Sequence, residues 1–154
     1  MKTIPLTQGK IAVVDDADYE RVIQHKWCYD SGGYATANVN GKQQRMHRFI
    51  LKAKRGEHVD HANMNGLDNQ RSNIRICNNS QNHANTRLRS DNTTGYKGVS
   101  YITRDDRFQA KIQVNGHHMN LGYFTDPKLA AIAYNEAAVK HFGEFARLNQ
   151  VEAK

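Results

Sequence analysis

Apolar and polar positions alternate most regularly in the last third of the chain, between residues 107 and 114. The apolar members are Phe108, Ala110, Ile112 and Val114, with polar residues between them. A period of two is typical of a strand with one buried face and one face in water. Asn115-Gly116 predicts a tight turn because both residues tolerate positive φ. The second strand, 117–124, should carry Leu121 and Tyr123 back to the core.

A helix is predicted directly after these two strands. Asp126-Pro127 marks its start, since proline is tolerated at the first helical position, and Gly143 marks its end. Small side chains on its inner face would allow close packing on a sheet: Ala130, Ala133, Ala137 and Ala138. From about Tyr96 onward the sequence therefore predicts three antiparallel strands covered by one helix.

The N-terminal part, from Ile4 to Gln44, has the pattern of short strands separated by turns. An apolar segment spans 10–14, and an acidic cap, Asp15, Asp16 and Asp18, should start a brief helix. Gly32-Gly33 and Asn40-Gly41 predict two tight hairpins. The strands that they would join into an antiparallel meander are 27–30, 34–39 and 42–46.

The segment 59–85 is dense in Asn, Asp and His, with apolar residues at intervals. Two short strands are predicted here, one ending at Asp60-His61 and one covering 73–77, followed by a helix from about Ser80. This arrangement would bring polar side chains from three elements to one point. Metal chemistry is the natural use of such a cluster.

These residue types fit phosphodiester hydrolysis, which needs a base, a cation for the leaving oxygen and a group that orients the base. His61 suits proton abstraction at neutral pH, and the amide oxygen of Asn73 could orient its ring. Asp60 and Asn82 offer hard oxygen ligands, which favour a single Mg²⁺ or Mn²⁺ over Zn²⁺. A lone histidine is more often structural, but the joint pattern favours catalysis.

Charge supports a polyanionic partner, since the chain has 22 Lys and Arg against 15 Asp and Glu and a net charge of +7. Six basic residues and no acidic one lie between Lys42 and Arg55. We interpret this stretch, with Arg48 as its candidate DNA contact, as phosphate-binding; the alternative is a solvated helix face. The segment 86–95 is polar and basic and resembles a linker.

Cys28 and Cys77 are the only cysteines, which is too few for a cysteine-based zinc site or a disulfide framework, so we expect buried thiols. No apolar run approaches the ~20 residues that cross a bilayer. The first ten residues also lack the apolar core of a signal peptide. We therefore expect a cytoplasmic protein, in the host cell cytoplasm if it is phage-encoded, with no membrane association.

The motif Asp60-His61, Asn73 and Asn82 resembles the HNH endonuclease signature in its phage homing-endonuclease form, a ββα-metal fold. The likeness spans roughly 9–85 and includes the lead-in Met46-His47-Arg48-Phe49-Ile50-Leu51. The resemblance implies that Asp60 and Asn82 bind the metal, His61 is the general base and Asn73 orients it. The third position is often histidine in this family, so His83 is the alternative to Asn82. Neighbouring helical residues point ~100° apart and cannot both face one ion in the same way.

Residues 92–149 resemble the APETALA-type, or ethylene-response-factor, DNA-binding domain. The motifs that carry this likeness are Gly95-Tyr96-Lys97-Gly98-Val99, Phe108-Gln109-Ala110-Lys111-Ile112, Leu121-Gly122-Tyr123-Phe124 and Ala130-Ala131-Ile132-Ala133-Tyr134-Asn135. Such domains lay a three-stranded sheet into the major groove.

The resemblance and the alternation together predict a DNA-reading set, in which basic side chains match guanine or phosphate and amides match adenine. Its members are Lys97, Ser100, Arg104, Arg107, Gln109, Lys111, Gln113, His118 and Asn120. For any one of them, a plain solvated strand face is the alternative.

The sequence thus predicts an α+β protein: antiparallel strands leading into a ββα-metal motif, then a three-stranded sheet covered by one helix. The predicted parts are an HNH domain at 1–85, a linker at 86–95, a DNA-binding domain at 96–149 and a tail at 150–154. The predicted function is metal-dependent, sequence-directed cleavage of double-stranded DNA, of the homing kind, with no protein partner evident. The alternatives are a non-catalytic DNA-binding regulator and an RNA-directed nuclease.

Overall fold

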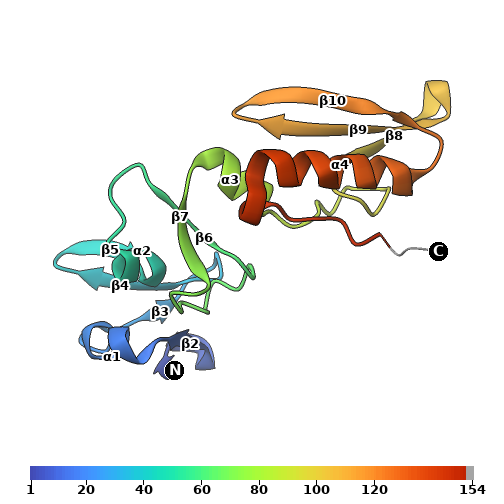
Figure 1. Ribbon diagram of the computed structural model, residues 1–154. Helices are drawn as coiled ribbons and strands as arrows, with labels where there is room; N and C mark the ends of the chain where they lie inside the picture. The colour runs from blue at the N-terminus through green and yellow to red at the C-terminus, as the bar shows by residue number, and fades with distance from the viewer. Residues whose placement is uncertain (152–154) are drawn as a thin grey trace. The chain divides into compact units, whose positions relative to one another are not determined.

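The protein is a mixed α+β chain of small antiparallel sheets and short helices, as the sequence predicts (Figure 1). The computed structural model describes residues 1–151; the rest of the predicted tail, 152–154, lies outside the described residues. The chain divides into two compact units, Met1–Asn78 and Asn79–Lys154. The division falls inside the range predicted for the first domain, because the helix that follows it packs within the second unit.

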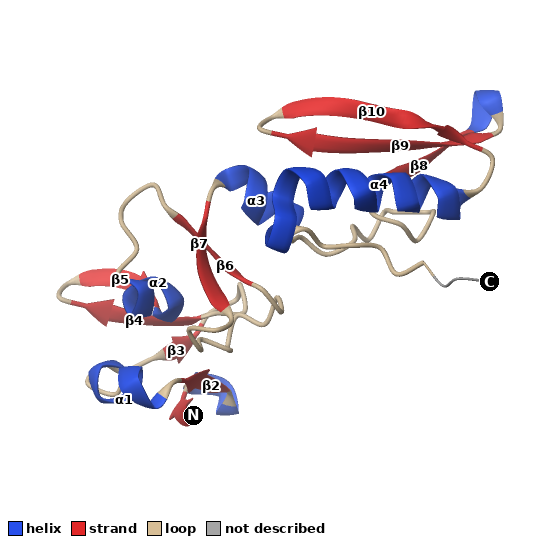
Figure 2. Cartoon of the chain, in the orientation of Figure 1, coloured by secondary structure: helices blue, strands red, loops and turns tan. Residues whose placement is uncertain are grey.

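The first unit contains a hairpin, a three-stranded sheet, a second hairpin and two short helices (Figure 2). Its elements are β1 (Lys2–Pro5), η1 (Thr7–Gly9), β2 (Ile11–Val14), α1 (Asp16–Val22), β3 (Cys28–Tyr29), β4 (Ala35–Val39), β5 (Lys42–Arg45), α2 (Met46–Leu51), β6 (His58–His61) and β7 (Ile74–Cys77). The strands pair as β1-β2, β3-β4-β5 and β6-β7. The predicted turn at Asn40-Gly41 is confirmed, with φ of 51° and 78°.

One apolar core holds the first unit together, and it joins elements far apart in the sequence. Its fully buried members include Val14, Val22, Met46 and Ile50. Trp27 packs in the same cluster and donates its indole N–H to the Val22 carbonyl at 2.8 Å. Because β2, α1 and α2 all contribute to it, this core fixes the N-terminal elements against the segment that follows β5.

The second unit is a three-stranded sheet of order β10-β9-β8 with one long helix packed on it. Its elements are α3 (Asn79–Ala84), β8 (Val99–Ile102), η2 (Thr103–Asp105), β9 (Arg107–Val114), β10 (His117–Phe124), α4 (Pro127–Phe142) and η3 (Gly143–Phe145). The predicted helix start and end are confirmed: the Asp126 carboxylate accepts from the Lys128 N–H at 2.8 Å, and Gly143 follows the last turn.

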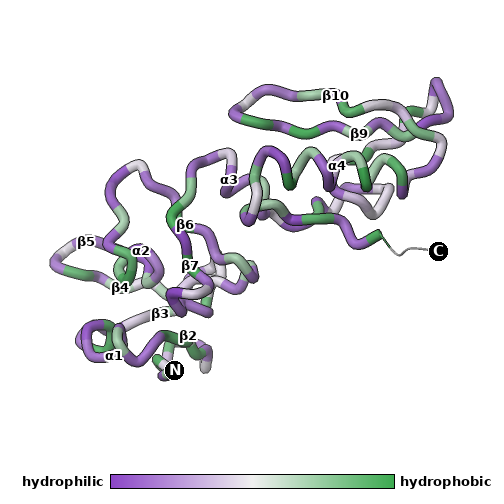
Figure 3. The backbone as a smooth tube through the Cα atoms, in the orientation of Figure 1, coloured by the Kyte–Doolittle hydropathy of each residue, from purple (hydrophilic) through white to green (hydrophobic). Residues whose placement is uncertain are grey.

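The predicted alternation along β9 is confirmed by its burial pattern, and Figure 3 shows hydrophobic and hydrophilic residues alternating along the strand. Ala110 and Ile112 are buried beneath α4, whereas Lys111 and Gln113 are exposed. The inner side of α4 is formed by Ala130, Ala131, Tyr134 and Ala138. Small residues here let the helix approach the sheet closely.

Tyr123 is exposed, so the prediction that it returns to the core is wrong. The register of β10 on β9 shifts between Asn120 and Gly122, which leaves Leu121 as an extra residue. Such a bulge reverses the alternation beyond it. Tyr123 therefore pairs with Gln109 on the exposed face, and Leu121 packs against the core.

Asp15 is the N-cap residue of α1, as predicted, but its side chain makes no capping hydrogen bond to the helix. Asp15 Oδ2 instead accepts from the Arg71 backbone N–H at 2.8 Å. Asp18, 2% exposed, accepts from the Arg71 guanidinium at 2.7 and 2.9 Å and from Arg21 at 2.7 Å. Both carboxylates thus tie α1 to the loop between β6 and β7.

We expect Gly98→Ala to destabilise the second unit by about 3 kcal/mol, from a left-handed backbone at an L residue and from overpacking. Gly98 has φ +75°, and a Cβ there would overlap the Tyr134 ring and lie 2.8 Å from the Lys111 carbonyl. Gly116→Ala is the matched control, since Gly116 has φ +86° but no atom within 4 Å of the added Cβ. Urea unfolding of both variants measures the difference, and equal losses would contradict the packing argument.

Candidate functional site

The β6-β7 hairpin brings three of the four predicted active-site residues together. Asp60 and His61 end β6, and Asn73 immediately precedes β7, whose Ile74 pairs with His61. All three are buried, with exposures of 7%, 5% and 9%. Buried polar residues need partners, and the contacts of each residue indicate what it does.

Asp60 is held by an arginine that the sequence analysis did not identify. Arg75 lies opposite Asp60 in the hairpin and donates to its Oδ2 from Nε at 3.0 Å and Nη2 at 2.8 Å. Pairing the two predicted strands with each other could have found it, because directly paired residues face the same side of a sheet. A carboxylate has several acceptor sites, so the Arg75 contacts at Oδ2 are compatible with a role as metal ligand.

Asn73 shapes the loop between the two strands. Its Oδ1 accepts from the Asn63 N–H at 2.9 Å, and its Nδ2 donates to the Asp68 carbonyl at 2.8 Å. Within the loop, the Asn65 side chain accepts from the Leu67 N–H at 3.1 Å and so caps a turn. Both ends of the Asn73 carboxamide therefore bind the loop backbone, and any effect of Asn73 on the His61 ring acts through this loop.

The His61 ring lies in a cluster of buried polar and aromatic groups. Its Nε2 is 3.5 Å from Oδ1 of Asn69, which is completely buried. The His47 ring lies edge to face with it, with centroids 4.8 Å apart and planes at 90°. Tyr34 packs on both histidines: its ring centroid lies 5.8 Å from that of His61 and 5.3 Å from that of His47. The sequence analysis did not identify Asn69.

Burial keeps both histidines neutral. It is the largest cause that lowers the pKa of His61; the Asn69 contact and the charges of Asp60 and Asp68 act in the opposite direction. Burial, with smaller effects of His61 and Arg45, lowers the pKa of His47 to about 3. A neutral imidazole can accept a proton at neutral pH, as a general base must.

Asn82 and its alternative His83 lie on α3, which belongs to the second unit. Asn82 is half-buried and His83 is exposed. Contacts within the second unit hold this helix: Ala84 packs in a core cluster with Ile112 and Tyr134, and Ser80 Oγ accepts from the Asn115 N–H at 3.0 Å. The choice between Asn82 and His83 as metal ligand stays a prediction.

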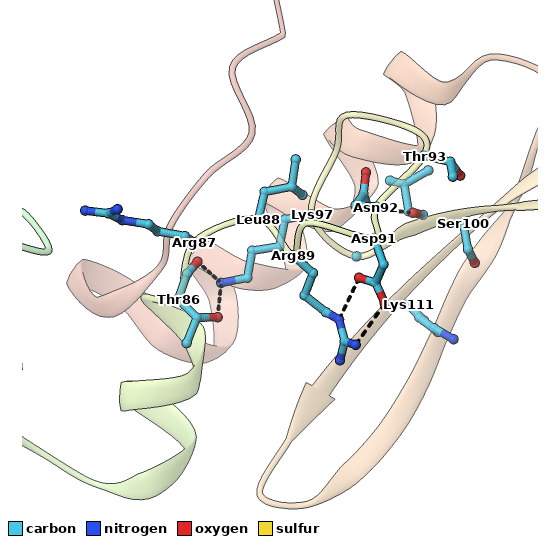
Figure 4. Close-up of a pocket in the computed structure, with 12 residues that line it drawn as sticks. Thr86, Arg87, Leu88, Arg89, Asp91, Asn92, Thr93, Lys97, Ser100 and Lys111 are labelled. Atoms are coloured by element: carbon cyan, nitrogen blue, oxygen red, sulfur yellow. Dashed lines mark hydrogen bonds and ion pairs between the residues drawn. The ribbon is translucent and has the colours of Figure 1, made fainter. Parts of the chain in front are cut away.

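Lys97 caps the C-terminal end of α3. Its ammonium donates to the carbonyls of His83, Ala84 and Thr86, the last at 3.0 Å (Figure 4). A cation is stabilising at the C-terminus of a helix, where the carbonyls lack partners. Burial, with Arg147 nearby, lowers the pKa of Lys97 to about 8. Its predicted contact with DNA would compete with these bonds.

A cavity of about 420 Å³ lies between the segment 86–93 and the start of the sheet. Figure 4 shows Arg89 at this cavity, paired with Asp91 through two bonds of 2.9 Å. The predicted linker therefore packs against Lys97 and Ser100 in the second unit.

Arg48 supports a loop in the first unit. Its guanidinium donates to the Glu57 carbonyl at 2.6 Å and to the Lys54 carbonyl at 2.8 Å. These bonds fix the loop between α2 and β6, and they leave the side chains of Lys52, Lys54 and Arg55 exposed. The loop lysines and Arg55 are thus better placed than Arg48 to meet solvent or a polyanion.

Six of the predicted DNA-reading residues share the sheet face that α4 does not cover. Pairing across the strands places Ser100 with Gln109, Lys111 with Asn120, and Gln113 with His118. Tyr123, which the sequence analysis assigned to the core, joins this face, and its hydroxyl oxygen accepts from the Gln109 side-chain amide at 3.2 Å. The face contains hydrogen-bonding groups of several kinds and one ammonium.

The two remaining arginines of the predicted set lie where β8 ends and β9 begins. Arg107 is exposed at the start of β9, paired with Ile102. Arg104 lies in η2 and binds the adjacent Asp105 at 2.8 Å. Since that pair is largely exposed, it contributes little to stability, and a stronger anion could replace the carboxylate.

Within residues 1–151, no three His, Cys, Asp or Glu side chains gather as a metal site would require. The predicted ligands, one carboxylate and one carboxamide, are oxygen donors of the kind that Mg²⁺ and Mn²⁺ accept when waters and phosphates complete the shell. Cys28 and Cys77 are free thiols, of which Cys77 is buried. None of the helices that the structure describes is long and apolar enough to cross a membrane.

The chain is similar to the uncharacterized HNH endonuclease L560 of Acanthamoeba polyphaga mimivirus. The two are 31% identical over 151 residues, which cover 94% of this chain and 78% of the relative. No protein-family model and no solved structure matches the chain.

We expect acid to destabilise the first unit through His47. Between pH 6.5 and about 3 the unfolded chain binds a proton at His47 that the folded chain does not. The free energy of unfolding therefore decreases as the pH falls through this window, by about 2 kcal/mol between pH 7 and pH 5 from this group. Urea unfolding of His47→Gln should show a smaller decrease.

His58→Gln is the control, because His58 is exposed on the same unit. It should keep the full acid sensitivity. The pKa of His61 is also lowered, so this residue also decreases the free energy of unfolding as the pH falls. Part of the pH dependence of the free energy of unfolding therefore remains in His47→Gln. If the free energy of unfolding of His47→Gln depended on pH as strongly as that of the wild-type protein, His47 would not be the source of the acid sensitivity.

Proposed function

The chain belongs to the HNH endonuclease family, and from this premise we propose that it is a metal-dependent, sequence-directed DNA endonuclease of the homing kind. It hydrolyses phosphodiester bonds in duplex DNA. The observation that carries the proposal is the pair Asp60-His61, in which a buried, neutral imidazole directly follows a buried carboxylate at the end of β6.

His61 is the general base in this proposal. Its ring accepts a proton from a water molecule, whose oxygen forms a bond to phosphorus as the bond to the 3′ oxygen breaks. The products are a 5′ phosphate and a 3′ hydroxyl. Burial favours the neutral form that this step needs. The loop shaped by Asn73 holds the ring at the end of the strand.

Asp60 and Asn82 are the proposed ligands of one Mg²⁺ or Mn²⁺. Bound there, the ion would neutralise the charge that develops on the leaving 3′ oxygen. Arg75 fixes the Asp60 carboxylate through Oδ2, so the side chain has one orientation before any ion binds.

The second unit is the proposed DNA-reading module, of the APETALA type. Support comes from the sheet face that α4 leaves uncovered, where amide, hydroxyl, imidazole and ammonium groups lie side by side. Lys111 can bind a phosphate or guanine, and the amides can read adenine. Tyr123 adds an aromatic ring to that face, with 49% exposure.

A non-catalytic regulator is the second candidate, since the same surface would bind DNA without cutting it. Binding without cleavage, with every divalent ion tested, would favour it. Competition between duplex DNA and structured RNA separates both from an RNA-directed nuclease.

We expect His61→Ala to reduce cleavage by about 10²–10⁴-fold, the usual contribution of a general base. The assay is conversion of supercoiled DNA carrying the native locus to nicked or linear forms with Mg²⁺ or Mn²⁺, with EDTA as the metal-free arm. His58→Ala is the matched control, because His58 is exposed on the same strand. Cleavage that survives His61→Ala would contradict the catalytic assignment.

We expect Lys111→Ala to weaken binding to duplex DNA and to lower the slope of log affinity against log salt by about 1, because one phosphate contact is lost. Lys140→Ala is the control: Lys140 is exposed on α4, the helix that covers the opposite face of the sheet. Fluorescence anisotropy at several KCl concentrations measures both. Equal effects of the two substitutions would show that the sheet face is not the DNA-binding surface.

A further inference from the structure

We propose that Asn69 is the positioning residue that fixes the tautomer and the orientation of His61, so that Nε2 carries the proton and Nδ1 is the basic nitrogen. The inference rests on the proposed function for the role of His61 as general base, whereas the contact between Asn69 and His61 does not depend on that function. It assigns to Asn69 the orienting role that the sequence pattern gave to Asn73.

The contact is direct. Asn69 Oδ1 lies 3.5 Å from His61 Nε2. This is a long hydrogen bond, as such contacts often are before substrate binds, and they tighten in the reacting complex. An amide oxygen can only accept, so the imidazole nitrogen opposite it must carry the hydrogen. The lone pair of the neutral ring is then on Nδ1.

The side chain of Asn69 is buried although part of it is unsatisfied. The residue is 0% exposed, and its Nδ2 has no hydrogen-bond partner among the described residues. Burying an amide without satisfying it costs free energy. A packing role would be served better by an apolar side chain of the same size. A buried polar group that is only partly satisfied, next to the base, indicates a role at that base.

The backbone of Asn69 is fixed independently of its side chain. Its N–H donates to the Val13 carbonyl at 2.8 Å, and the Val13 N–H donates to the Leu67 carbonyl at 2.8 Å, so β2 pairs with the loop on both sides of Asp68. Two residues later Arg71 is held by Asp15 and Asp18. The side chain therefore extends from a rigid support toward His61.

Two other residues near the ring act in different ways. The Asn73 carboxamide is engaged at Asn63 and Asp68. His47 meets the ring edge to face, and its Nδ1 has no partner among the described residues. It restricts the position of the ring by packing, whereas Asn69 distinguishes the two nitrogens of His61.

The test compares Asn69→Leu, which keeps the size and removes the acceptor, with Asn69→Ala and with Asn65→Ala. Asn65 caps the same loop, at 3.1 Å from the Leu67 N–H. Long-range ¹H–¹⁵N NMR at pH 7.5 without metal reports which His61 nitrogen is protonated. We expect one tautomer, Nε2–H, in the wild-type protein and in Asn65→Ala, and a mixture of tautomers in both Asn69 variants.

Single-turnover cleavage of the native DNA locus gives the second readout. Loss of a partner that orients such a ring typically costs about 10–100-fold. We expect that reduction in rate for both Asn69 variants, with DNA affinity unchanged. A twofold effect or less is expected for Asn65→Ala.

Three results would overturn the inference: Nδ1–H as the wild-type tautomer, an unchanged His61 tautomer in both Asn69 variants, or an equal shift in Asn65→Ala. Because the NMR measurement needs no cleavage, absence of nuclease activity in the wild-type protein would refute the proposed function and leave the Asn69 contact to be decided separately. Urea unfolding at pH 7.5 identifies a variant that fails to fold. The other Asn69 variant is then used for the NMR and cleavage measurements.

Discussion

The ion pair of Asp18 with Arg71 is the contact on which the geometry of the site depends most. Asp18 is 2% exposed and is bound by Arg71 and Arg21, and the first of these contacts contributes most to lowering its pKa. A buried carboxylate is stable only with such partners. Asp18 belongs to α1 and Arg71 to the β6-β7 loop. The ion pair therefore fixes the loop that contains Asn69 to the short N-terminal helix. The bond from the Arg71 N–H to Asp15 and the pairing of β2 with Leu67 and Asn69 also hold this loop.

Local patterns explain why much of the fold could be predicted from the sequence. Alternation over 107–114, the turns at Asn40-Gly41 and Asn115-Gly116, and the helix start at Asp126-Pro127 depend on residues within a few positions of one another. Each is a property of the backbone or of one face of one element. The exception, Tyr123, followed from a bulge, which shifts the alternation without changing the composition of the strand.

The partners of polar side chains were harder to predict, because they come from distant segments. The chain between 59 and 85 contains many asparagines, and composition alone cannot distinguish Asn65, which caps a turn, from Asn69, which faces His61. Arg48 was predicted to contact DNA because it lies in a basic stretch, and Lys97 because of its place in the APETALA-type pattern. In the folded chain each binds backbone carbonyls, and each stabilises a loop or a helix end. A cationic side chain serves either purpose, and only its neighbours decide which.

The second unit joins two parts of the proposed function in one body. Ala84 packs in the core of this unit and Lys97 caps the same helix, so α3, which bears Asn82, is fixed to the sheet that bears Lys111 and Gln113. In the proposed function the sheet reads DNA and Asn82 binds the ion. The distance from the sheet face to Asn82 is then fixed by covalent and packing contacts within one unit. The base, His61, is held by a separate set of contacts in the first unit. In the proposed enzyme, the residues that bind the DNA therefore belong to the second unit. The residue that accepts the proton, His61, belongs to the first unit.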